Sequence, residues 1–489
     1  MINSLKRLTK HSAVYGIGHI VTRSVNFLLL PLYTNKLPTR DFGAFAVIFS
    51  FLALTLIVYT YGMDTAFLRH FVLSEEKNKR RQIFSTAFWS VASVTCILTC
   101  LIYVKAAFFS RMFFVDSAYA HLFRLTSLIL FFDALSTLPF LFLRAEEKSV
   151  QFALLKFVNV IVNVTFNIIL IVQLHKGVAG IFLANVYASA ITFLLLIPIL
   201  VKQISLLFNR KAFKELLRFG LPYLPSTMAV VLLDLVDRFI LEKLTGLDVV
   251  GVYHAGYKLG TFMALFVAAF RFAWHPFFLS ISKQENAKDV YARVLTYFTT
   301  IGAWLFLLVS VFIEDIVRFK IGGLALFGQD YWAGTRIVPL ILLSYLTYGI
   351  YVNFVVGIYL EKKTKYLPAI TGAGAGVNIL ANFLLIPKFG MMGSAYATLL
   401  GYLVMAALLY AITRGFYKVE YEFKRIAKLG LVVAALFYFG YYSHGSWEIL
   451  TKVSLLLGFP LLLLSVGFFE RREVNKIRGM LRLGQKASS

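Results

Sequence analysis

The sequence predicts an all-α integral membrane protein with about fourteen transmembrane helices, and two observations carry this prediction. Of the 489 residues, 59% are hydrophobic and only 15% are charged, whereas a soluble domain has about 25% charged residues. The mean hydropathy is +0.77. Apolar segments of about 20 residues, the length that crosses a bilayer, follow one another along nearly the whole chain. So much apolar surface must face lipid.

The spans are expected at Ala13–Tyr33, Phe42–Gly62, Ile83–Tyr103, His121–Leu143, Phe152–Val172, Gly180–Val201, Phe219–Leu241, Gly251–Leu279, Tyr291–Ile313, Thr335–Leu360, Tyr366–Ile386, Met391–Thr413, Ile426–Ser443 and Ile449–Phe469. The first of them resembles a signal peptide in its basic start. However, its core carries polar residues, and no small-residue cleavage site follows it, so we interpret it as an uncleaved helix.

The positive charge of the chain is a topology signal. The net charge is +25, and most Lys and Arg residues fall in the loops on one side of the expected spans. This asymmetry is typical of the cytoplasmic side of a membrane protein, so both termini are expected in the cytoplasm. The basicity is therefore attributed to topology and anionic headgroups, and no nucleic-acid partner is expected.

Two motifs recur in the same order, about 210 residues apart. They are the pairs Asn163/Asn167 and Asn378/Asn382, each followed by glycines (Gly177 and Gly180, Gly390 and Gly393), and the segments Asp41–Phe45 and Asp248–Tyr253. An even number of spans separates the copies, which predicts a parallel repeat. The expected organisation is a six-helix lobe at 1–201, an amphipathic cytoplasmic linker at 202–218, a second six-helix lobe at 219–413, and two extra helices with a basic tail at 414–489.

Three further features follow from local patterns. Ile2–Leu8, Leu206–Phe219 and Val474–Leu481 combine basic and apolar residues, which favours amphipathic helices in the inner headgroup layer over solvated linkers. The four repeated asparagines are expected to form hydrogen bonds between helices. Cys96 and Cys100 share one helix face, but two thiols alone make a poor metal site, so no metal is expected.

Ionisable residues within the spans are the candidate functional residues, because each costs about 2.5–3.5 kcal/mol at the bilayer centre. Basic residues outnumber acidic ones there, which favours an anionic substrate. In the first span His19, Arg23 and Asn26 share one helix face with Tyr15. This polar stripe predicts a surface that lines water or ligand; a buried ion pair of Arg23 with Asp133 is the alternative.

Lys258 and Arg271 lie 13 residues apart on the expected eighth span, about 20 Å along a helix. With Arg23 they predict a ladder of cations for a migrating phosphate, unless either side chain snorkels to the surface. Asp133 is a candidate ligand for a coupling ion. Asp234 and Arg238, four residues apart, are expected to neutralise each other, and Asp237 is expected to be wet.

Several segments resemble the bacterial polysaccharide-biosynthesis flippases. They are Asn378–Thr398, Arg23–Tyr33 followed by Leu37–Gly43, and Phe219–Pro225. The resemblance extends over nearly the whole chain and identifies a Wzx-type transporter of O-antigen and related repeat units, within the multidrug/oligosaccharidyl-lipid/polysaccharide superfamily. It implies two six-helix lobes and a cationic central cavity.

The resemblance further implies transport of undecaprenyl-pyrophosphate-linked oligosaccharide from the inner to the outer leaflet of a bacterial cytoplasmic membrane, as in lipopolysaccharide assembly. Other membrane proteins of polysaccharide assembly are implied as partners. No covalent chemistry is needed, so we expect neither enzymatic activity nor a bound cofactor. The expected driving force is an ion gradient, of Na⁺ or H⁺, or the membrane potential.

Three rival functions remain. A cation-coupled multidrug (MATE-type) antiporter would use acidic residues in the first lobe, where Asp133 lies but the first helix carries Arg23. A lipid II flippase shares the architecture and the anionic cargo. A membrane glycosyltransferase, polymerase or ligase would need a large loop that carries carboxylates, and none is expected here.

Overall fold

The structure is a computed structural model that describes residues 27, 29–114, 117–206, 208–321, 324–441, 448–470 and 473. These residues form helices joined by short connections, together with one antiparallel ribbon of two short strands. Among them, eleven helices are long and apolar enough to cross a membrane, or twelve if the bent α10–α11 pair is one span. The prediction of an all-helical, multi-span membrane protein is therefore confirmed.

The α-helices are α2 (Leu30–Lys36), α3 (Thr39–Thr60), α4 (Met63–Leu73), α5 (Lys77–Val104), α6 (Ala106–Phe114), α7 (Ala120–Ala145), α8 (Ser149–Asn167), α9 (Gly177–Gln203), α10 (Arg210–Gly220), α11 (Leu224–Thr245), α12 (Leu247–Gly260), α13 (Phe262–Ile281), α14 (Ala287–Arg318), α15 (Val338–Phe354), α16 (Val356–Leu360), α17 (Leu367–Phe389), α18 (Met391–Arg414), α19 (Phe423–Tyr441) and α20 (Glu448–Ser465). The shorter elements are η1 (Ile168–Gln173), η2 (Leu221–Tyr223), β1 (Lys320–Ile321), β2 (Leu324–Ala325), η3 (Gln329–Ile337) and η4 (Thr364–Tyr366).

The expected number of fourteen spans stays a prediction. The first expected span, Ala13–Tyr33, lies mostly outside the described residues. The thirteenth corresponds to α19, which begins with three basic residues, Lys424, Arg425 and Lys428, within its first two turns. The expected eighth span corresponds to α12 and α13, which together form one candidate span, Leu247–Ile281, with a turn at Thr261 between them.

The chain divides into two compact units. Unit 1 consists of Met1–Leu259, Lys320–Ile337 and Lys365–Met405, and unit 2 of Gly260–Phe319, Val338–Thr364 and Ala406–Ser489. The predicted lobes and linker, with boundaries at 201, 218 and 413, stay a prediction.

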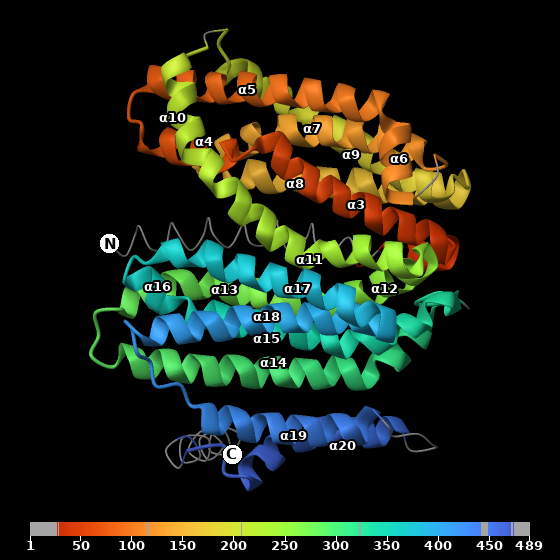
Figure 1. Ribbon diagram of the computed structural model, residues 1–489, viewed down its shortest axis with the longest axis vertical. Helices are drawn as coiled ribbons and strands as arrows, with labels where there is room; N and C mark the ends of the chain where they lie inside the picture. The colour runs from red at the N-terminus through yellow and green to blue at the C-terminus, as the bar shows by residue number, and fades with distance from the viewer. Residues whose placement is uncertain are drawn as a thin grey trace, which may run out of the picture. The chain divides into compact units, whose positions relative to one another are not determined.

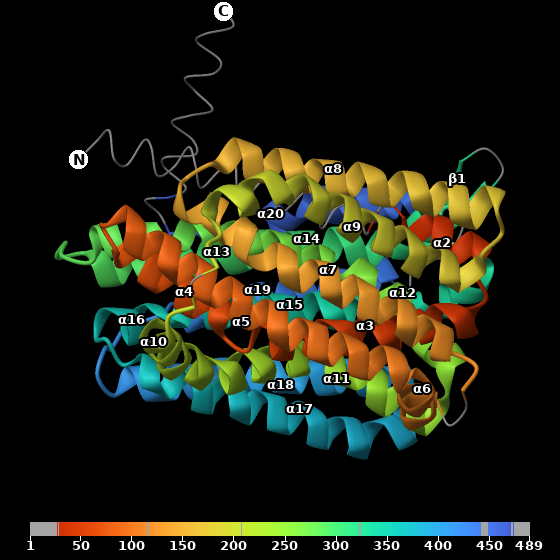
Figure 2. The ribbon, with the colours of Figure 1, turned by 90° about the horizontal axis from the view of Figure 1, so that it is seen from above.

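Within unit 1, α8, α9, α7 and α5 follow one another, each packed on the next (Figures 1 and 2). At one end of this bundle lies an aromatic core that includes Phe67, Phe84 and Phe142, and α4 and α10 contribute to it. α11 packs between α3 on one side and α17 on the other. This position places the polar residues of α11 inside the unit.

α10 is the amphipathic helix that the sequence predicts between the two expected lobes. Asn209 caps it by accepting hydrogen bonds from the backbone N–H groups of Lys211 and Ala212. Leu216 on its apolar face is buried against the aromatic core of unit 1. The face that was expected to lie in the headgroup layer therefore packs on protein, because α4 and α5 offer it a preformed apolar surface.

The two copies of the asparagine motif have the same local structure. The side-chain amide of Asn167 donates to the backbone carbonyl of Asn163, and that of Asn382 donates to the carbonyl of Asn378. Asn167 also accepts a hydrogen bond from Tyr33 of α2. The contacts within each asparagine pair lie inside one helix, whereas the hydrogen bond from Tyr33 joins two helices, which is the kind of contact that was predicted for the asparagines.

The second repeated motif brings its two copies into contact. A Cβ added to Gly43 of α3 would lie 2.0 Å from the carbonyl oxygen of Leu247, and one added to Gly251 of α12 would lie 2.0 Å from that of Thr39. Glycine at both positions therefore allows the two backbones to touch. Thr39 also donates a hydrogen bond of 2.6 Å to Asp248.

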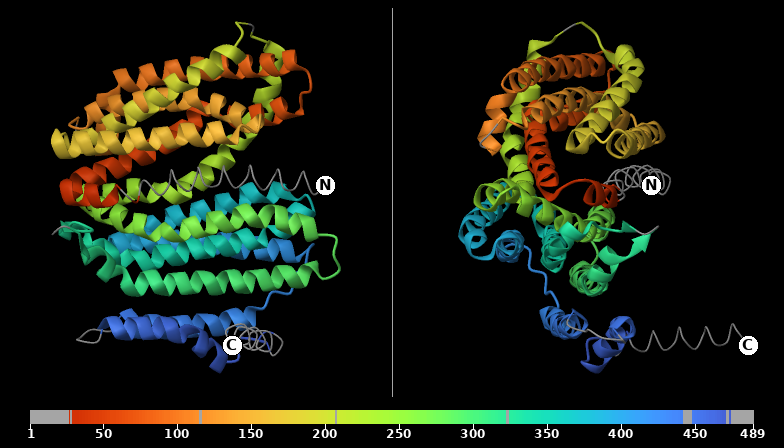
Figure 3. Two further views of the ribbon diagram at one scale, coloured as in Figure 1. Left: turned by 180° about the vertical axis from the view of Figure 1, so that it is seen from behind. Right: turned by 90° about the vertical axis from the view of Figure 1, so that its right-hand side faces the viewer.

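Unit 2 packs α13, α14 and α15 together, and α19 and α20 pack on α14 and on each other (Figure 3). Phe306 of α14 contacts Phe437 of α19, with 5.4 Å between ring centroids. A Cβ added to Gly440 of α19 would lie 2.9 Å from Cγ2 of Val311, so glycine at this position allows α19 to approach α14 closely. The last two helices are thus an integral part of this unit.

Candidate functional site

The most deeply buried charges of unit 1 lie where α11 meets α12. Arg238 is 1% exposed and Asp237 is fully buried. Nη1 of Arg238 lies 2.5 Å from Oδ1 of Asp237, and the other carboxylate oxygen accepts a hydrogen bond from Tyr253. The guanidinium also lies over the ring of Tyr257, 3.9 Å from its centroid. A buried cation with an opposite charge and polar neighbours is typical of a structural ion pair.

The prediction that Asp237 is exposed to water is wrong, because its side chain is fully buried. α12 covers this face of α11, and Tyr253 holds the carboxylate toward the protein interior. Asp234 lies in the same cluster: its backbone carbonyl accepts a hydrogen bond from Arg238, and its carboxylate accepts one from Tyr402 of α18. The predicted neutralisation of Arg238 by Asp234 stays a prediction, and the ion pair that the structure gives Arg238 is with Asp237.

Asp133, the candidate coupling residue, has two polar neighbours in unit 1. It accepts a hydrogen bond from Ser189 of α9, and its charge interacts with that of Lys156 of α8. The ammonium group of Lys156 lies 4.1 Å from the centroid of Phe140. Lys156 is a basic residue within an expected span, but it was not predicted as the counter-charge of Asp133.

A third paired cation lies in unit 2. Lys452 of α20 is 3% exposed. Its Nζ atom lies 2.7 Å from Oδ2 of Asp315 on α14 and 2.5 Å from Oε1 of Glu448. Two carboxylates hold this lysine, so it fastens α20 to α14 and is not a candidate for an anionic ligand.

Arg271 of α13 differs from these cations. It is exposed, and ten residues separate it from Ile281 at the end of the helix, which is about 15 Å at helical rise and about half of the hydrocarbon thickness. Among the described residues, no carboxylate lies within 4.0 Å of its guanidinium. Its Nη1 donates a hydrogen bond of 2.9 Å to the hydroxyl of Tyr348 on α15. A tyrosine hydroxyl is neutral, so the full positive charge of Arg271 remains uncompensated by this contact.

The other predicted cavity residues are His19, Arg23, Asn26 and Lys258. His19, Arg23 and Asn26 lie outside the described residues. Lys258 lies, partly buried, on α12 in unit 1, whereas Arg271 belongs to unit 2. The predicted ladder of Arg23, Lys258 and Arg271 therefore stays a prediction.

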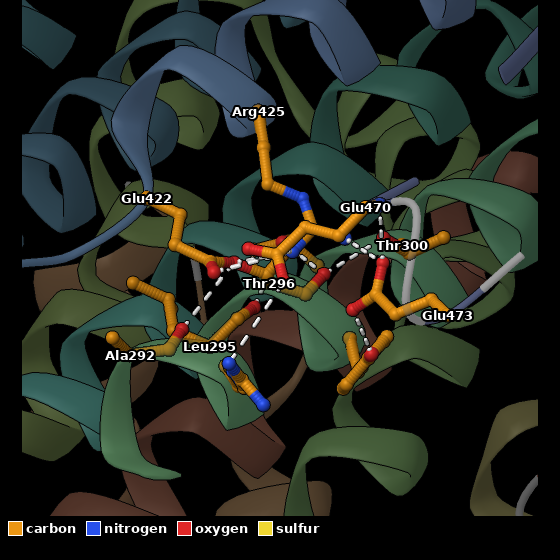
Figure 4. Close-up of polar contacts among 11 residues, drawn as sticks. Ala292, Leu295, Thr296, Thr300, Glu422, Arg425, Glu470 and Glu473 are labelled. Carbon is orange, nitrogen blue, oxygen red and sulfur yellow. Dashed lines mark hydrogen bonds and ion pairs between the residues drawn. The ribbon is translucent and has the colours of Figure 1, made fainter. Parts of the chain in front are cut away.

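A polar cluster that sequence reasoning missed lies at the start of α19 in unit 2 (Figure 4). Arg425 lies 3.0 Å from Glu422 and 2.9 Å from Glu473. Glu422 accepts a hydrogen bond of 2.6 Å from Thr296, and Glu473 accepts one from Tyr297, both on α14. The i, i+3 spacing of Glu422 and Arg425 was the available signal. This cluster ties the segment after α20 to α14.

Partial burial alone would raise the pKa of Glu473. Hydrogen bonds from Tyr297 and from the backbone N–H of Glu470, together with the charge of Arg425, outweigh burial and hold this pKa below its usual value. The carboxylate is therefore ionised over the whole neutral range, which keeps the cluster intact there.

The sequence model of the family described as polysaccharide biosynthesis protein matches residues 8–282 of the chain. An uncharacterized membrane protein of Methanocaldococcus jannaschii is 21% identical over 438 residues, which cover 81% of this chain and 83% of that protein. Lsg locus putative protein 1 of Haemophilus influenzae is 23% identical over 370 residues, which cover 70% of this chain and 85% of that protein.

Two kinds of solved structure share the fold. The lipid II flippase MurJ in an inward closed conformation has a TM-score of 0.75 and 16% identity, and the match covers 93% of this chain and 99% of that one. An inward-facing multidrug resistance MATE family transporter of the MOP superfamily has a TM-score of 0.68 and 12% identity, with 84% and 96% covered. The fold is therefore that of membrane transporters and flippases.

Proposed function

The chain belongs to the family of polysaccharide biosynthesis proteins, and from this premise we propose that it moves an undecaprenyl-pyrophosphate-linked oligosaccharide from the inner to the outer leaflet of a bacterial cytoplasmic membrane. The repeat units of O-antigen and related glycans are the proposed cargo. Both termini face the cytoplasm in this proposal, and other membrane proteins of polysaccharide assembly are the proposed partners.

The environment of Arg271 carries the proposal. An arginine in the middle of a span is costly when it faces lipid, and such residues face a water-filled cavity or a partner. Arg271 is exposed and hydrogen-bonded to a neutral hydroxyl. The guanidinium fork matches the oxygen geometry of a phosphate, so a diphosphate is the ligand that best compensates this charge.

The mechanism that we propose is alternating access. The diphosphate reaches Arg271 from the cytoplasmic side, and the predicted cations Arg23 and Lys258 receive it at other depths. The polyprenyl chain stays in the lipid, where its transfer costs no apolar exposure to water. A Na⁺ or H⁺ gradient supplies the driving force, and no covalent bond is made or broken.

A reconstituted flipping assay tests this proposal. The purified protein is placed in liposomes with a fluorescent polyprenyl-pyrophosphate oligosaccharide, and transfer between leaflets is followed by quenching from the outside. We expect robust transfer by the wild type and a loss of about tenfold or more in Arg271→Ala, the size of one charge-assisted contact. Arg124→Ala is the matched control, because Arg124 is an exposed arginine near a span end, 5.8 Å from the ring of Tyr103.

Each other outcome indicates a rival function. Transfer of a lipid-linked peptidoglycan precursor but not of other lipid-linked oligosaccharides would indicate a lipid II flippase. Efflux of cationic dyes without lipid transfer would indicate a multidrug antiporter. Equal transfer by wild type and Arg271→Ala would leave a flippase and exclude Arg271 as the headgroup site.

A further inference from the structure

Two tyrosines of α15 form the surroundings of Arg271 on one side. Tyr348 accepts the hydrogen bond from the guanidinium, and its ring stacks on that of Tyr351, with 5.9 Å between centroids and 18° between planes. Tyr351 is buried. Because Tyr351 backs the ring of Tyr348, the hydroxyl that orients Arg271 has a fixed position. The guanidinium is therefore held in place before any ligand arrives, which lowers the cost of binding.

A second layer of side chains, the tier of His275 and Tyr359, lies one helical turn from Arg271 along α13. His275 follows Arg271 by four residues on α13, so the two side chains share a face, about 6 Å apart along the axis. The ring of His275 meets the ring of Tyr359 on α16 edge to face, with centroids 4.8 Å apart. Phe278 supports Tyr359, with 6.2 Å between centroids. Tyr359 is 37% exposed, so part of its ring is open to a ligand.

The two tiers differ in chemistry. The tier of Arg271 and Tyr348 offers a cation with several N–H donors. The tier of His275 and Tyr359 offers an aromatic surface with a polar edge, a combination suited to a ligand that is apolar on one face and polar at its rim. A sugar ring is such a ligand, because its C–H groups form an apolar face and its hydroxyls form a polar rim.

We propose that His275 and Tyr359 form a subsite for the first sugar of the cargo, while Arg271, oriented by Tyr348, holds the diphosphate to which that sugar is attached. This inference rests on the proposed function. The spacing of one turn between Arg271 and His275 corresponds to the short step from a diphosphate to the sugar bonded to it. The sugar tier lies closer to Ile281 and Leu360, the ends of α13 and α16, so on the predicted topology the sugar lies on the cytoplasmic side of the diphosphate.

An alternative explanation for these aromatic residues is that they belong to the belt at the membrane–water interface, where tyrosines are enriched. Such a belt accounts for Tyr359, which lies near the end of its span. It does not account for Tyr348 and Tyr351, which lie inside the candidate span Gln329–Leu360. Their rings stack on each other, and Tyr348 accepts the hydrogen bond from Arg271. The belt also predicts no preference for a sugar, and this difference can be measured.

The test compares two probes on the purified full chain in detergent micelles, by titration calorimetry. One probe is farnesyl diphosphate, and the other is farnesyl diphosphate that carries one N-acetylglucosamine. We expect the wild type to bind the glycosylated probe more tightly. Tyr359→Leu should weaken that binding about fivefold, within the range of one aromatic contact, and leave farnesyl diphosphate unchanged. Arg271→Ala should weaken both probes.

Two controls keep the result specific. Tyr359→Phe retains the ring and should retain most of the sugar preference. Tyr438→Leu removes a tyrosine that is 62% exposed on α19 and should change neither affinity. A sugar preference that survives in Tyr359→Leu, or an equal loss for both probes, would overturn the sugar subsite. A wild type that binds neither probe would instead overturn the proposed function.

Discussion

Arg238 and Arg271 are both arginines within apolar spans, but they have opposite surroundings. Arg238 is buried in unit 1 and paired with Asp237 at 2.5 Å. Arg271 is exposed in unit 2 and donates to the neutral hydroxyl of Tyr348 at 2.9 Å. A carboxylate cancels the charge of an arginine, whereas a tyrosine orients it without cancelling it. The comparison indicates that the partner of an intramembrane cation, more than its depth, separates a structural residue from a ligand-binding one.

The largest expected effect is on the paired side of this comparison. Arg238→Met leaves the buried carboxylate of Asp237 without its counter-charge, which costs about 4 kcal/mol. Arg271→Met removes no buried partner and should change the free energy of unfolding by no more than about 0.5 kcal/mol. Thermal unfolding of both variants in one detergent measures the difference.

The double variant Asp237→Leu/Arg238→Met is the control for this prediction, because a buried ion pair can be replaced by apolar residues at little cost. It should recover most of the stability that Arg238→Met loses. Equal and small losses in all three variants would show that burial does not make Arg238 structural, and the comparison would fail.

A second variant gives Arg271 the kind of partner that Arg238 has. Tyr348→Glu places a carboxylate beside the guanidinium and should reduce lipid transfer about tenfold, because the anion site is then occupied by the protein's own charge. Flipping in proteoliposomes measures this loss. Tyr348→Gln is the matched neutral control and should transfer more than the glutamate variant. Equal transfer by the two variants would mean that charge at this position is not what matters.

The sequence reveals the cations of this comparison but not their partners. Arg238 and Arg271 stand out because charges are rare within apolar spans, and the same apolar runs predict the helices that carry them. Tyr348 lies 77 residues from Arg271, and only the packing of α13 on α15 brings them together. Asp237 was predicted to be exposed to water because it lies near the end of a span, and the sequence does not reveal that α12 covers it. The turn at Thr261 within the candidate span Leu247–Ile281 is equally hidden, because the chain on both sides of it is apolar.

Asp133 and Lys156 test whether the comparison extends to a third cation, because Lys156 is the basic residue whose charge interacts with Asp133. If Lys156 is its structural partner, Asp133→Asn should lower the free energy of unfolding by about 1–3 kcal/mol, the cost of leaving a buried group unsatisfied. Asp133→Asn/Lys156→Met should restore part of that loss. Unfolding in detergent measures both. An unchanged stability, together with transport that no longer responds to an imposed Na⁺ or H⁺ gradient, would identify Asp133 as a coupling residue instead.

The smallest expected effect concerns the Arg425 cluster of unit 2, where a cation is paired but only partly buried. The pKa of Glu473 is lowered from its usual value of 4.5 in the folded protein. Its contribution to stability is therefore fully present above pH 4.5 and is lost as the pH falls through the lower folded-state value. At pH 7, Glu473→Gln should cost less than about 1 kcal/mol, as is typical of ion pairs with access to solvent.

This cost should shrink as the pH is lowered below 4.5, because protonation then removes the same charge from the wild type. Unfolding of the wild type and of Glu473→Gln at a series of pH values measures this convergence. Glu215→Gln, at an exposed position of α10, is the control and should show no such dependence. A cost that stays constant with pH would mean that Glu473 acts through packing rather than through its charge, and the cluster would then not belong with the paired cations.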